Sequence, residues 1–152
     1  LEEVVSGRPA AVLVQALPAN EPLRVLLVDD NTVNLMVACL QLLKIWPQAS
    51  VTQCSDGPQA LRCLDVQAFD VALIDMVMPE MDGMQLTRQI RRQFPKQTAR
   101  MPILALTANT HPHERQQCLD AGMDDVLHKP MDTAKLVASV SSLVRRAREL
   151  DT

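Results

Sequence analysis

Short apolar segments alternate with longer segments of helical spacing over most of this chain, from Arg24 onward. The apolar segments are residues 25–28, 51–54, 71–74, 103–106 and 126–127. This alternation is typical of a parallel β-sheet whose strands are joined by crossover helices. Most of the segments are continuously apolar, which indicates that helices cover both faces of the sheet. The pattern therefore predicts a doubly wound α/β fold with a five-stranded parallel sheet.

Helical spacing is found between the apolar segments and after the last of them. The candidate helices are residues 33–45, 58–66, 84–93, 113–121 and 133–149. Pro58 suits the first turn of a helix, and Gly122 stands where a helix would end. We therefore expect five helices to flank the sheet.

The composition fits a water-soluble globular domain, since 47% of the residues are hydrophobic and 22% are charged. No apolar run reaches the roughly 18 residues that a membrane-spanning helix needs, and the acidic Glu2 and Glu3 do not fit a secretory signal. The net charge of −3 and the scarcity of aromatic residues do not favour nucleic-acid binding. We expect a cytoplasmic location without direct membrane contact, either alone or as the cytoplasmic part of a longer, membrane-bound protein.

Residues 1–22 do not follow the repeating pattern. They contain an apolar run, residues 10–17, which is followed by Pro18 and Pro22. This segment is interpreted as a linker or the remnant of a preceding domain, and the compact domain is expected to span residues 23–150. Two alternatives remain for the apolar run: the last strand of a preceding domain, or a segment that packs on the main domain.

Polar side chains follow four of the apolar segments, at once or, for Lys129, after His128. They are Asp29, Asp30, Asp75, Thr107 and Lys129. Each alone is also a common cap or turn residue, but ligands of open α/β sheets bind beyond the carboxyl ends of the strands, where these residues would converge. Three carboxylates repel one another unless a cation lies among them, and Mg²⁺ suits a small open site of oxygen ligands. The lysine and threonine would serve a phosphoryl group, with one carboxylate as its nucleophile.

Four segments carry a specific resemblance. They read VLLVDDN at residues 25–31, ALIDMVMPEMDG at 72–83, ILALTAN at 103–109 and AGMDDVLHKP at 121–130. Together they resemble the receiver domain of two-component response regulators over roughly residues 23–150, and they are most similar to receivers fused to hybrid sensor histidine kinases. The resemblance implies a flavodoxin-like sheet with the strand order 2-1-3-4-5.

The resemblance also implies a role for each carboxylate. Asp75 would accept the phosphoryl group and contribute to the Mg²⁺ site. Asp30 would bind Mg²⁺ directly, whereas Asp29 would bind it largely through water. The backbone carbonyl of Val77 would complete the protein ligands.

Further implications concern the residues around the phosphoryl group. Thr107 would donate a hydrogen bond to it, and Lys129 would pair with one of its oxygens. A cis peptide bond would join Lys129 to Pro130. Val126 departs from the family, because many receivers carry Tyr or Phe three residues before this lysine.

The implied function is that of a phosphorelay receiver, which takes a phosphoryl group from a phosphohistidine onto Asp75 and relays or slowly hydrolyses it. Such a domain phosphorylates itself and is not a classical enzyme. One alternative is a receiver fold that docks partners without chemistry. A phosphohydrolase of the haloacid dehalogenase type is disfavoured, because that family has a second Asp where this chain has Val77. Flavin binding on a similar fold is also disfavoured, because the sequence shows no loop that would cradle the flavin phosphate.

The candidate helix at residues 33–45 is apolar on more than one side. One stripe is expected to face the sheet and consists of Val37, Ala38, Leu42 and Ile45. A second stripe, expected to face solvent, consists of Met36, Cys39, Leu40 and Leu43. An exposed apolar stripe beside a reactive site indicates a partner, and the resemblance implies a histidine kinase or histidine phosphotransfer domain.

The residues two positions after Asp75 and Thr107 are Val77 and Asn109. The resemblance places both beside the path of a water that would hydrolyse the phosphorylated aspartate. Valine cannot orient a water molecule, so we expect the phosphorylated state to last for minutes or longer.

Overall fold

The computed structural model of the chain describes residues 15–108 and 111–150. Within these residues one parallel sheet is formed by β1 (Arg24–Val28), β2 (Ser50–Cys54), β3 (Val71–Asp75), β4 (Ile103–Thr107) and β5 (Asp125–His128). The strands lie in the order β2-β1-β3-β4-β5. The predicted strands and the strand order implied by the resemblance are therefore confirmed.

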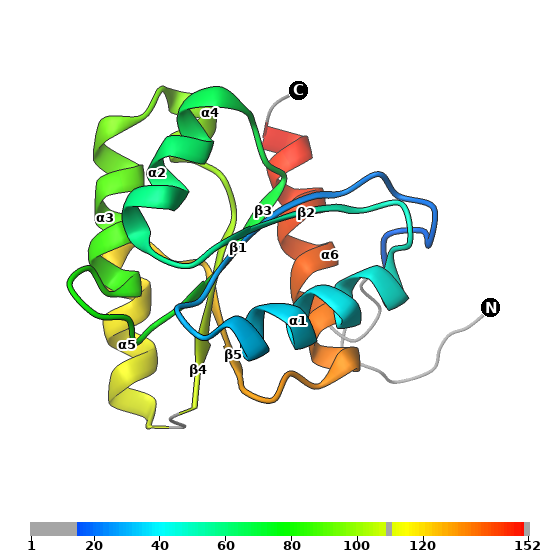
Figure 1. Cartoon of the computed structure of the whole chain (residues 1–152). Coiled ribbons are helices and arrows are strands. Elements are labelled where there is room, and N and C mark those ends of the chain that lie inside the picture. Colours follow the sequence, from blue (N-terminus) through cyan, green and yellow to red (C-terminus); the bar gives the residue numbers. More distant parts are fainter. Residues whose placement is uncertain (1–14, 109–110, 151–152) are drawn as a thin grey trace.

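The helices form one layer on each face of the sheet (Figure 1). One face is covered by α1 (Thr32–Ile45) and α6 (Thr133–Leu150), and the other by α2 (Gly57–Val66), α3 (Gly83–Gln93) and α5 (Pro112–Ala121). The five predicted helices are thus present, and the described residues add a sixth, α4 (Lys96–Ala99). With only four residues, α4 is too short to show helical periodicity in the sequence. No helix of the described ranges is long and apolar enough to cross a membrane.

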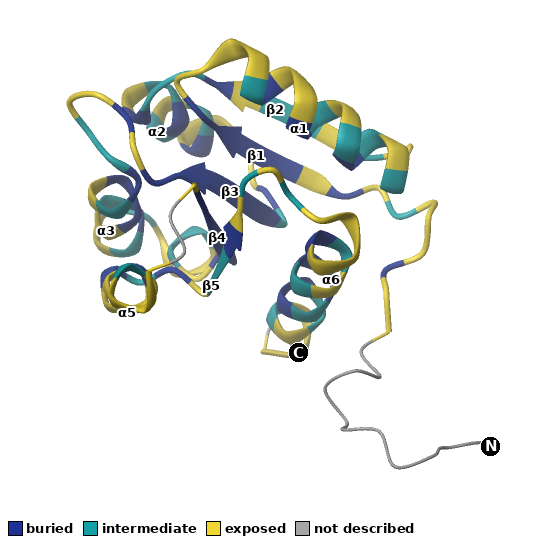
Figure 2. Ribbon diagram, turned by 90° about the horizontal axis from the view of Figure 1, so that it is seen from below, coloured by how far each residue is buried: buried dark blue, intermediate teal, exposed yellow. Residues whose placement is uncertain are grey.

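Two buried apolar clusters hold these layers together. The first lies under α1 and α6 and includes Leu27 and Leu73, whereas the second lies under α2, α3 and α5 and includes Ile74 and Ala105. Successive residues of a strand point to opposite faces of the sheet, so a strand covered on both sides must be apolar throughout. Figure 2 shows the central strands buried along most of their length.

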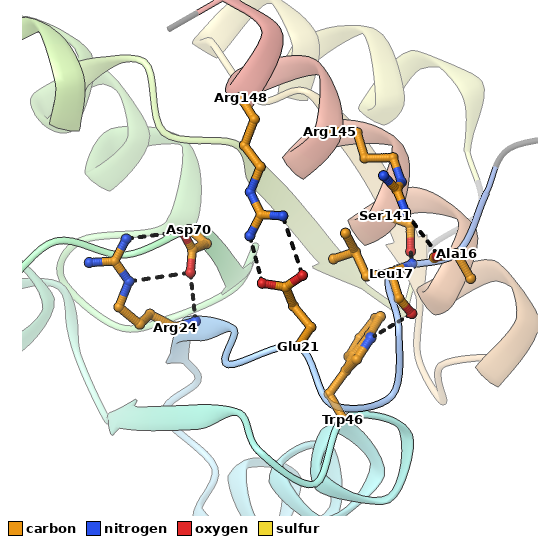
Figure 3. Close-up of polar contacts among 9 residues, drawn as sticks. All are labelled: Ala16, Leu17, Glu21, Arg24, Trp46, Asp70, Ser141, Arg145 and Arg148. Atoms are coloured by element: carbon orange, nitrogen blue, oxygen red, sulfur yellow. Dashed lines mark hydrogen bonds and ion pairs between the residues drawn. The ribbon is translucent and has the colours of Figure 1, made fainter. Parts of the chain in front are cut away.

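A segment that precedes the sheet, residues 15–22, lies against α6 and the end of α1 (Figure 3). The Leu17 side chain is buried, and its backbone N–H donates to Ser141 Oγ at 3.0 Å. The Trp46 indole N–H donates to the Leu17 carbonyl at 3.4 Å. Arg145 donates to the carbonyls of Gln15 and Ala16 at 2.9 and 3.1 Å. Residues 1–14, which include most of the apolar run near the start of the chain, lie outside the described residues.

Side-chain exposure along α1 corrects the predicted division of this helix. Val37 was expected to face the sheet but is 56% exposed, and the buried positions are Leu35, Ala38 and Leu42. Cys39 was expected to face solvent but is half-buried against the first core cluster. The pitch of the helix explains both results, because spacings of three and four residues align the buried positions, whereas Val37 is turned by about 100° from Ala38.

Candidate functional site

Three carboxylates converge beyond the carboxyl ends of two neighbouring strands. Asp29 and Asp30 directly follow β1, and Asp75 is the last residue of β3. One oxygen atom from each carboxylate lies within 4.8 Å of the other two. Asp29 and Asp75 are buried, whereas Asp30 is exposed. The structure thus brings together the three acids that the sequence placed at strand ends.

Lys129 joins this cluster from the loop after β5. Its Nζ atom donates to Asp75 Oδ1 at 3.0 Å and to Asp29 Oδ2 at 3.3 Å. The backbone N–H of Lys129 donates to the carbonyl of Thr107 at 2.8 Å, which ties the loop to β4. The peptide bond between Lys129 and Pro130 is cis, as the resemblance implied. The predicted lysine therefore bridges two of the three predicted acids.

Burial and charge act in opposite directions on these ionisable groups. Burial raises the pKa of Asp75 above its ordinary value, and the charge of Asp29 adds to the rise, although the hydrogen bond and charge of Lys129 oppose it. Burial lowers the pKa of Lys129, but hydrogen bonds and charges from Asp75 and Asp29 outweigh burial and raise it. The lysine therefore stays charged and only partly compensates the acids around it.

Local hydrogen bonds fix the position of Asp29. Its Oδ1 atom accepts the backbone N–H of Asn31 at 2.9 Å, and its own N–H donates to the carbonyl of Cys54 at 3.1 Å. Asn31 in turn caps α1, because its side-chain oxygen accepts the N–H groups of Val33 and Asn34. The Asp29 carboxylate therefore links the end of β1 to the residue that caps α1.

Thr107 lies at the end of β4 and is only 3% exposed. Its hydroxyl donates to Glu114 Oε1, on the first turn of α5, at 2.6 Å. Sequence reasoning found Thr107 but missed Glu114. The only sequence signal for this residue is an acid near a helix start, where acids are common for reasons of helix stability.

The model of the response regulator receiver domain family matches residues 25–141. This chain belongs to that family. The resemblance seen in its sequence motifs is thereby confirmed.

Several sensor histidine kinases contain a region similar to this receiver. Sensor histidine kinase RcsC of Escherichia coli strain K12 is 32% identical over 152 residues, which cover 98% of this chain and 15% of that protein. Sensor protein GacS of Pseudomonas syringae is 35% identical over 141 residues, which cover 92% of this chain and 15% of that protein. The chain therefore spans about 15% of the length of these relatives.

Among solved structures, the receiver domain of sensor histidine kinase PA1611 from Pseudomonas aeruginosa has a fold similar to that of this chain. The two chains are 39% identical with a TM-score of 0.72, and the match covers 81% of this chain and 98% of that one. The PA1611 structure contains a magnesium ion coordinated in its active-site cleft.

The loop after β3 approaches Asp75 closely in this receiver. Val77 is 77% exposed, and its backbone N–H acts to lower the pKa of the Asp75 carboxylate, against the larger effect of burial. At the far end of the loop, Gly83 begins α3, and a Cβ atom there would lie 2.5 Å from the carbonyl oxygen of Asp75. Another residue at Gly83 would therefore displace the loop, a constraint that the sequence interpretation did not identify.

The donor set of the site fits a hard divalent cation. When all four groups are ionised, three carboxylates against one ammonium leave two negative charges. Carboxylate and carbonyl oxygens are the ligands that Mg²⁺ uses in proteins, and an open, partly exposed site leaves room for its waters. The same geometry presents a carboxylate oxygen to an incoming electrophile, with an ammonium beside it to attract anionic oxygens.

Proposed function

We propose that this receiver accepts a phosphoryl group from a phosphohistidine onto Asp75 in a Mg²⁺-dependent reaction, and then relays the group or loses it slowly to water. The observation that carries this proposal is the bridge from Lys129 to Asp29 and Asp75 beside a third carboxylate. Similarity to part of several sensor histidine kinases supports a place within a hybrid histidine kinase, with the domain on the cytoplasmic side.

The transfer itself needs one new bond and one broken bond. A carboxylate oxygen of Asp75 forms a bond to phosphorus while the P–N bond to the donor imidazole breaks, and the bonding electrons leave with the imidazole nitrogen. Lys129 is bound to the same carboxylate, so its ammonium is positioned to pair with a phosphoryl oxygen as charge arrives. The Thr107 hydroxyl would donate to another phosphoryl oxygen.

Four groups of the chain would hold the metal: the carboxylates of Asp29, Asp30 and Asp75, and the backbone carbonyl of Val77. A bound Mg²⁺ would supply positive charge that offsets the phosphoryl oxygens and the carboxylates. The convergence of the three carboxylate oxygens within 4.8 Å supports this set, and so does the magnesium ion in the PA1611 receiver.

The principal test measures phosphorylation with a small phosphodonor and Mg²⁺. Asp75→Asn should abolish labelling, whereas Lys129→Ala should retain Mg²⁺ binding and lose most of the labelling, because the lysine charge serves the phosphoryl group. Full labelling of Asp75→Asn would show that Asp75 is not the phosphoryl acceptor. An unlabelled wild-type chain that still binds a kinase or phosphotransfer partner would instead favour the alternative of a docking module without chemistry.

The exposed face of α1 is proposed as the docking surface for the histidine-bearing partner. It consists of Val33, Met36, Val37 and Leu40, which are 55–62% exposed. These residues recur at helical spacing on the helix that begins two residues after Asp30, so a partner bound there would lie beside the acids. Met36 and Leu40 were expected on this surface, whereas Cys39 and Leu43 are only partly exposed and contribute less.

Leu40→Asp tests the docking surface. Because Leu40 is 62% exposed, the variant should fold and should accept a phosphoryl group normally from a small donor. Transfer from a phosphorylated partner should be at least about tenfold slower. Val66→Asp is the matched control, since Val66 is 81% exposed on α2. An equal loss from both donors in Leu40→Asp would contradict a docking role.

A slow loss of the phosphoryl group is also proposed, because the exposed Val77 side chain cannot hydrogen-bond a water molecule. Asn109, the other residue considered for this step, lies outside the described residues. Val77→Asn should shorten the lifetime of the phosphorylated chain severalfold, as measured by loss of label without a partner. Loss within seconds from the wild-type chain would contradict the proposal.

A further inference from the structure

The Thr107 hydroxyl already has an acceptor in this structure. Its 2.6 Å bond to Glu114 Oε1 has the length of a strong, charge-assisted O–H···O⁻ bond. Thr107 is buried, so its hydroxyl is shielded from competing water. The bond also joins two separate elements, the end of β4 and the first turn of α5.

The folding of β4 and α5 explains why these two side chains meet. Along β4, Ile103 and Ala105 belong to the core cluster under α5, and the alternation of the strand gives Thr107 the same face. On α5, Glu114 lies one turn before Cys118, which is fully buried in that same cluster. The sheet-facing side of α5 therefore presents a carboxylate to the last residue of β4.

A hydroxyl has only one proton and can donate one hydrogen bond at full strength. In the function proposed above, on which this inference rests, Thr107 donates to the phosphoryl group on Asp75. That bond and the bond to Glu114 compete for the same proton. We propose that Glu114 is a positioning residue that holds the Thr107 hydroxyl while Asp75 is unmodified and releases it when the phosphoryl group arrives.

This competition has two consequences for the receiver. The free energy of the Thr107–Glu114 bond is subtracted from the binding of the phosphoryl group, so Glu114 sets how strongly the modified state is favoured. Release of the bond also removes a link between β4 and α5, so the modification of Asp75 reaches α5 through Thr107.

The test uses beryllofluoride, a phosphoryl mimic, with saturating Mg²⁺, and measures its affinity by calorimetry. Glu114→Ala removes the competing acceptor and should tighten binding roughly three- to tenfold. Glu114→Gln should fall between the two, because an amide oxygen accepts a weaker, uncharged bond. Asp120→Ala is the matched control, since this exposed acid of α5 is bonded to Gln116 and should leave the affinity unchanged.

A second series separates the hydrogen bond from simple charge repulsion. In a Thr107→Val background the hydroxyl is absent, so Glu114→Ala should no longer tighten beryllofluoride binding. Tightening by the same factor in that background would overturn the inference, because the effect would then come from the Glu114 charge alone. Thermal melts of all variants verify folding, and Glu114→Gln alone suffices if Glu114→Ala does not fold.

The outcomes distinguish this inference from the proposed function. A wild-type chain that binds no beryllofluoride at Asp75 contradicts the proposed function and the inference together. A wild-type chain that binds it with the same affinity as Glu114→Ala contradicts the inference alone. Tighter binding by Glu114→Ala that depends on Thr107 supports both.

Discussion

The amino-terminal and carboxyl-terminal ends of the strands, called here the amino edge and the carboxyl edge of the sheet, differ in how their charged residues are paired. At the amino edge, arginines and carboxylates pair one to one, at 2.8–3.1 Å. The pairs are Arg24 with Asp70, Arg91 with Asp124, and Arg148 with Glu21. At the carboxyl edge, three carboxylates converge, and the ammonium of Lys129 pairs with two of them, Asp29 and Asp75.

This difference separates charges that serve the fold from charges that serve a ligand. In a one-to-one pair, each charge offsets part of the desolvation cost of the other, and both members can also bond nearby backbone groups. Uncompensated acids gain nothing from being held together, because like charges raise the free energy of the folded state. They are therefore expected where a bound cation or reacting group supplies the missing charge.

The largest effect on stability is expected at the amino edge, from Arg91→Ala. The guanidinium of Arg91 donates to the carbonyls of Ala99, Met101 and Gly122 as well as to Asp124. Its removal should lower the free energy of unfolding by about 2–3 kcal/mol, measured by urea denaturation, and leave Asp75 labelling intact in the folded chain. If the free energy of unfolding changed by less than about 0.5 kcal/mol, Arg91 would contribute no more to stability than an ordinary surface residue.

An intermediate effect is expected at the carboxyl edge, from Asp30→Asn. Without metal, removing one of three like charges should raise the free energy of unfolding by up to about 1 kcal/mol. The wild-type melting temperature should rise with Mg²⁺, because the ion binds only the folded chain, and the variant should lose most of that rise. Equal stabilisation of both chains by Mg²⁺ would exclude Asp30 from the metal ligands.

The smallest effect is expected from Arg24→Ala, at the amino edge. The Arg24 side chain is 51% exposed, and exposed ion pairs contribute about 1 kcal/mol or less. Asp70 would also keep the backbone N–H of residue 24, which it accepts at 2.8 Å. Denaturation should show a loss of about 0.5 kcal/mol. A loss as large as that of Arg91→Ala would show that exposure does not rank these pairs.

The sequence predicted the carboxyl edge better than the contacts around it. Asp29 and Asp75 could be located because each ends a continuous apolar segment, and parallel strands bring their carboxyl ends to one edge. Glu114 could not be located, because an acid near a helix start is common and its contact with Thr107 depends on how α5 packs. The exposure of Val37 was mispredicted, because apolar residues on both sides of α1 leave its rotation to packing.

The amino edge and the segment before it were less accessible to sequence reasoning. The contact between Leu17 and Ser141 joins residues 124 positions apart, and neither residue belongs to a recognisable motif. The three arginine–carboxylate pairs also join residues from different elements, with no fixed spacing between them. Such contacts depend on the assembled tertiary structure, whereas apolar periodicity is local.

The chain contains a single tryptophan, Trp46, and its indole is fully buried with its N–H on the Leu17 carbonyl. Indole emission shifts to longer wavelength when the ring meets water, so the intrinsic fluorescence of this receiver should report whether residues 15–22 are in place. The site acids are at the opposite end of α1, so phosphorylation by itself should leave the emission nearly unchanged. A spectral change when a partner binds would therefore indicate a movement near residues 15–22.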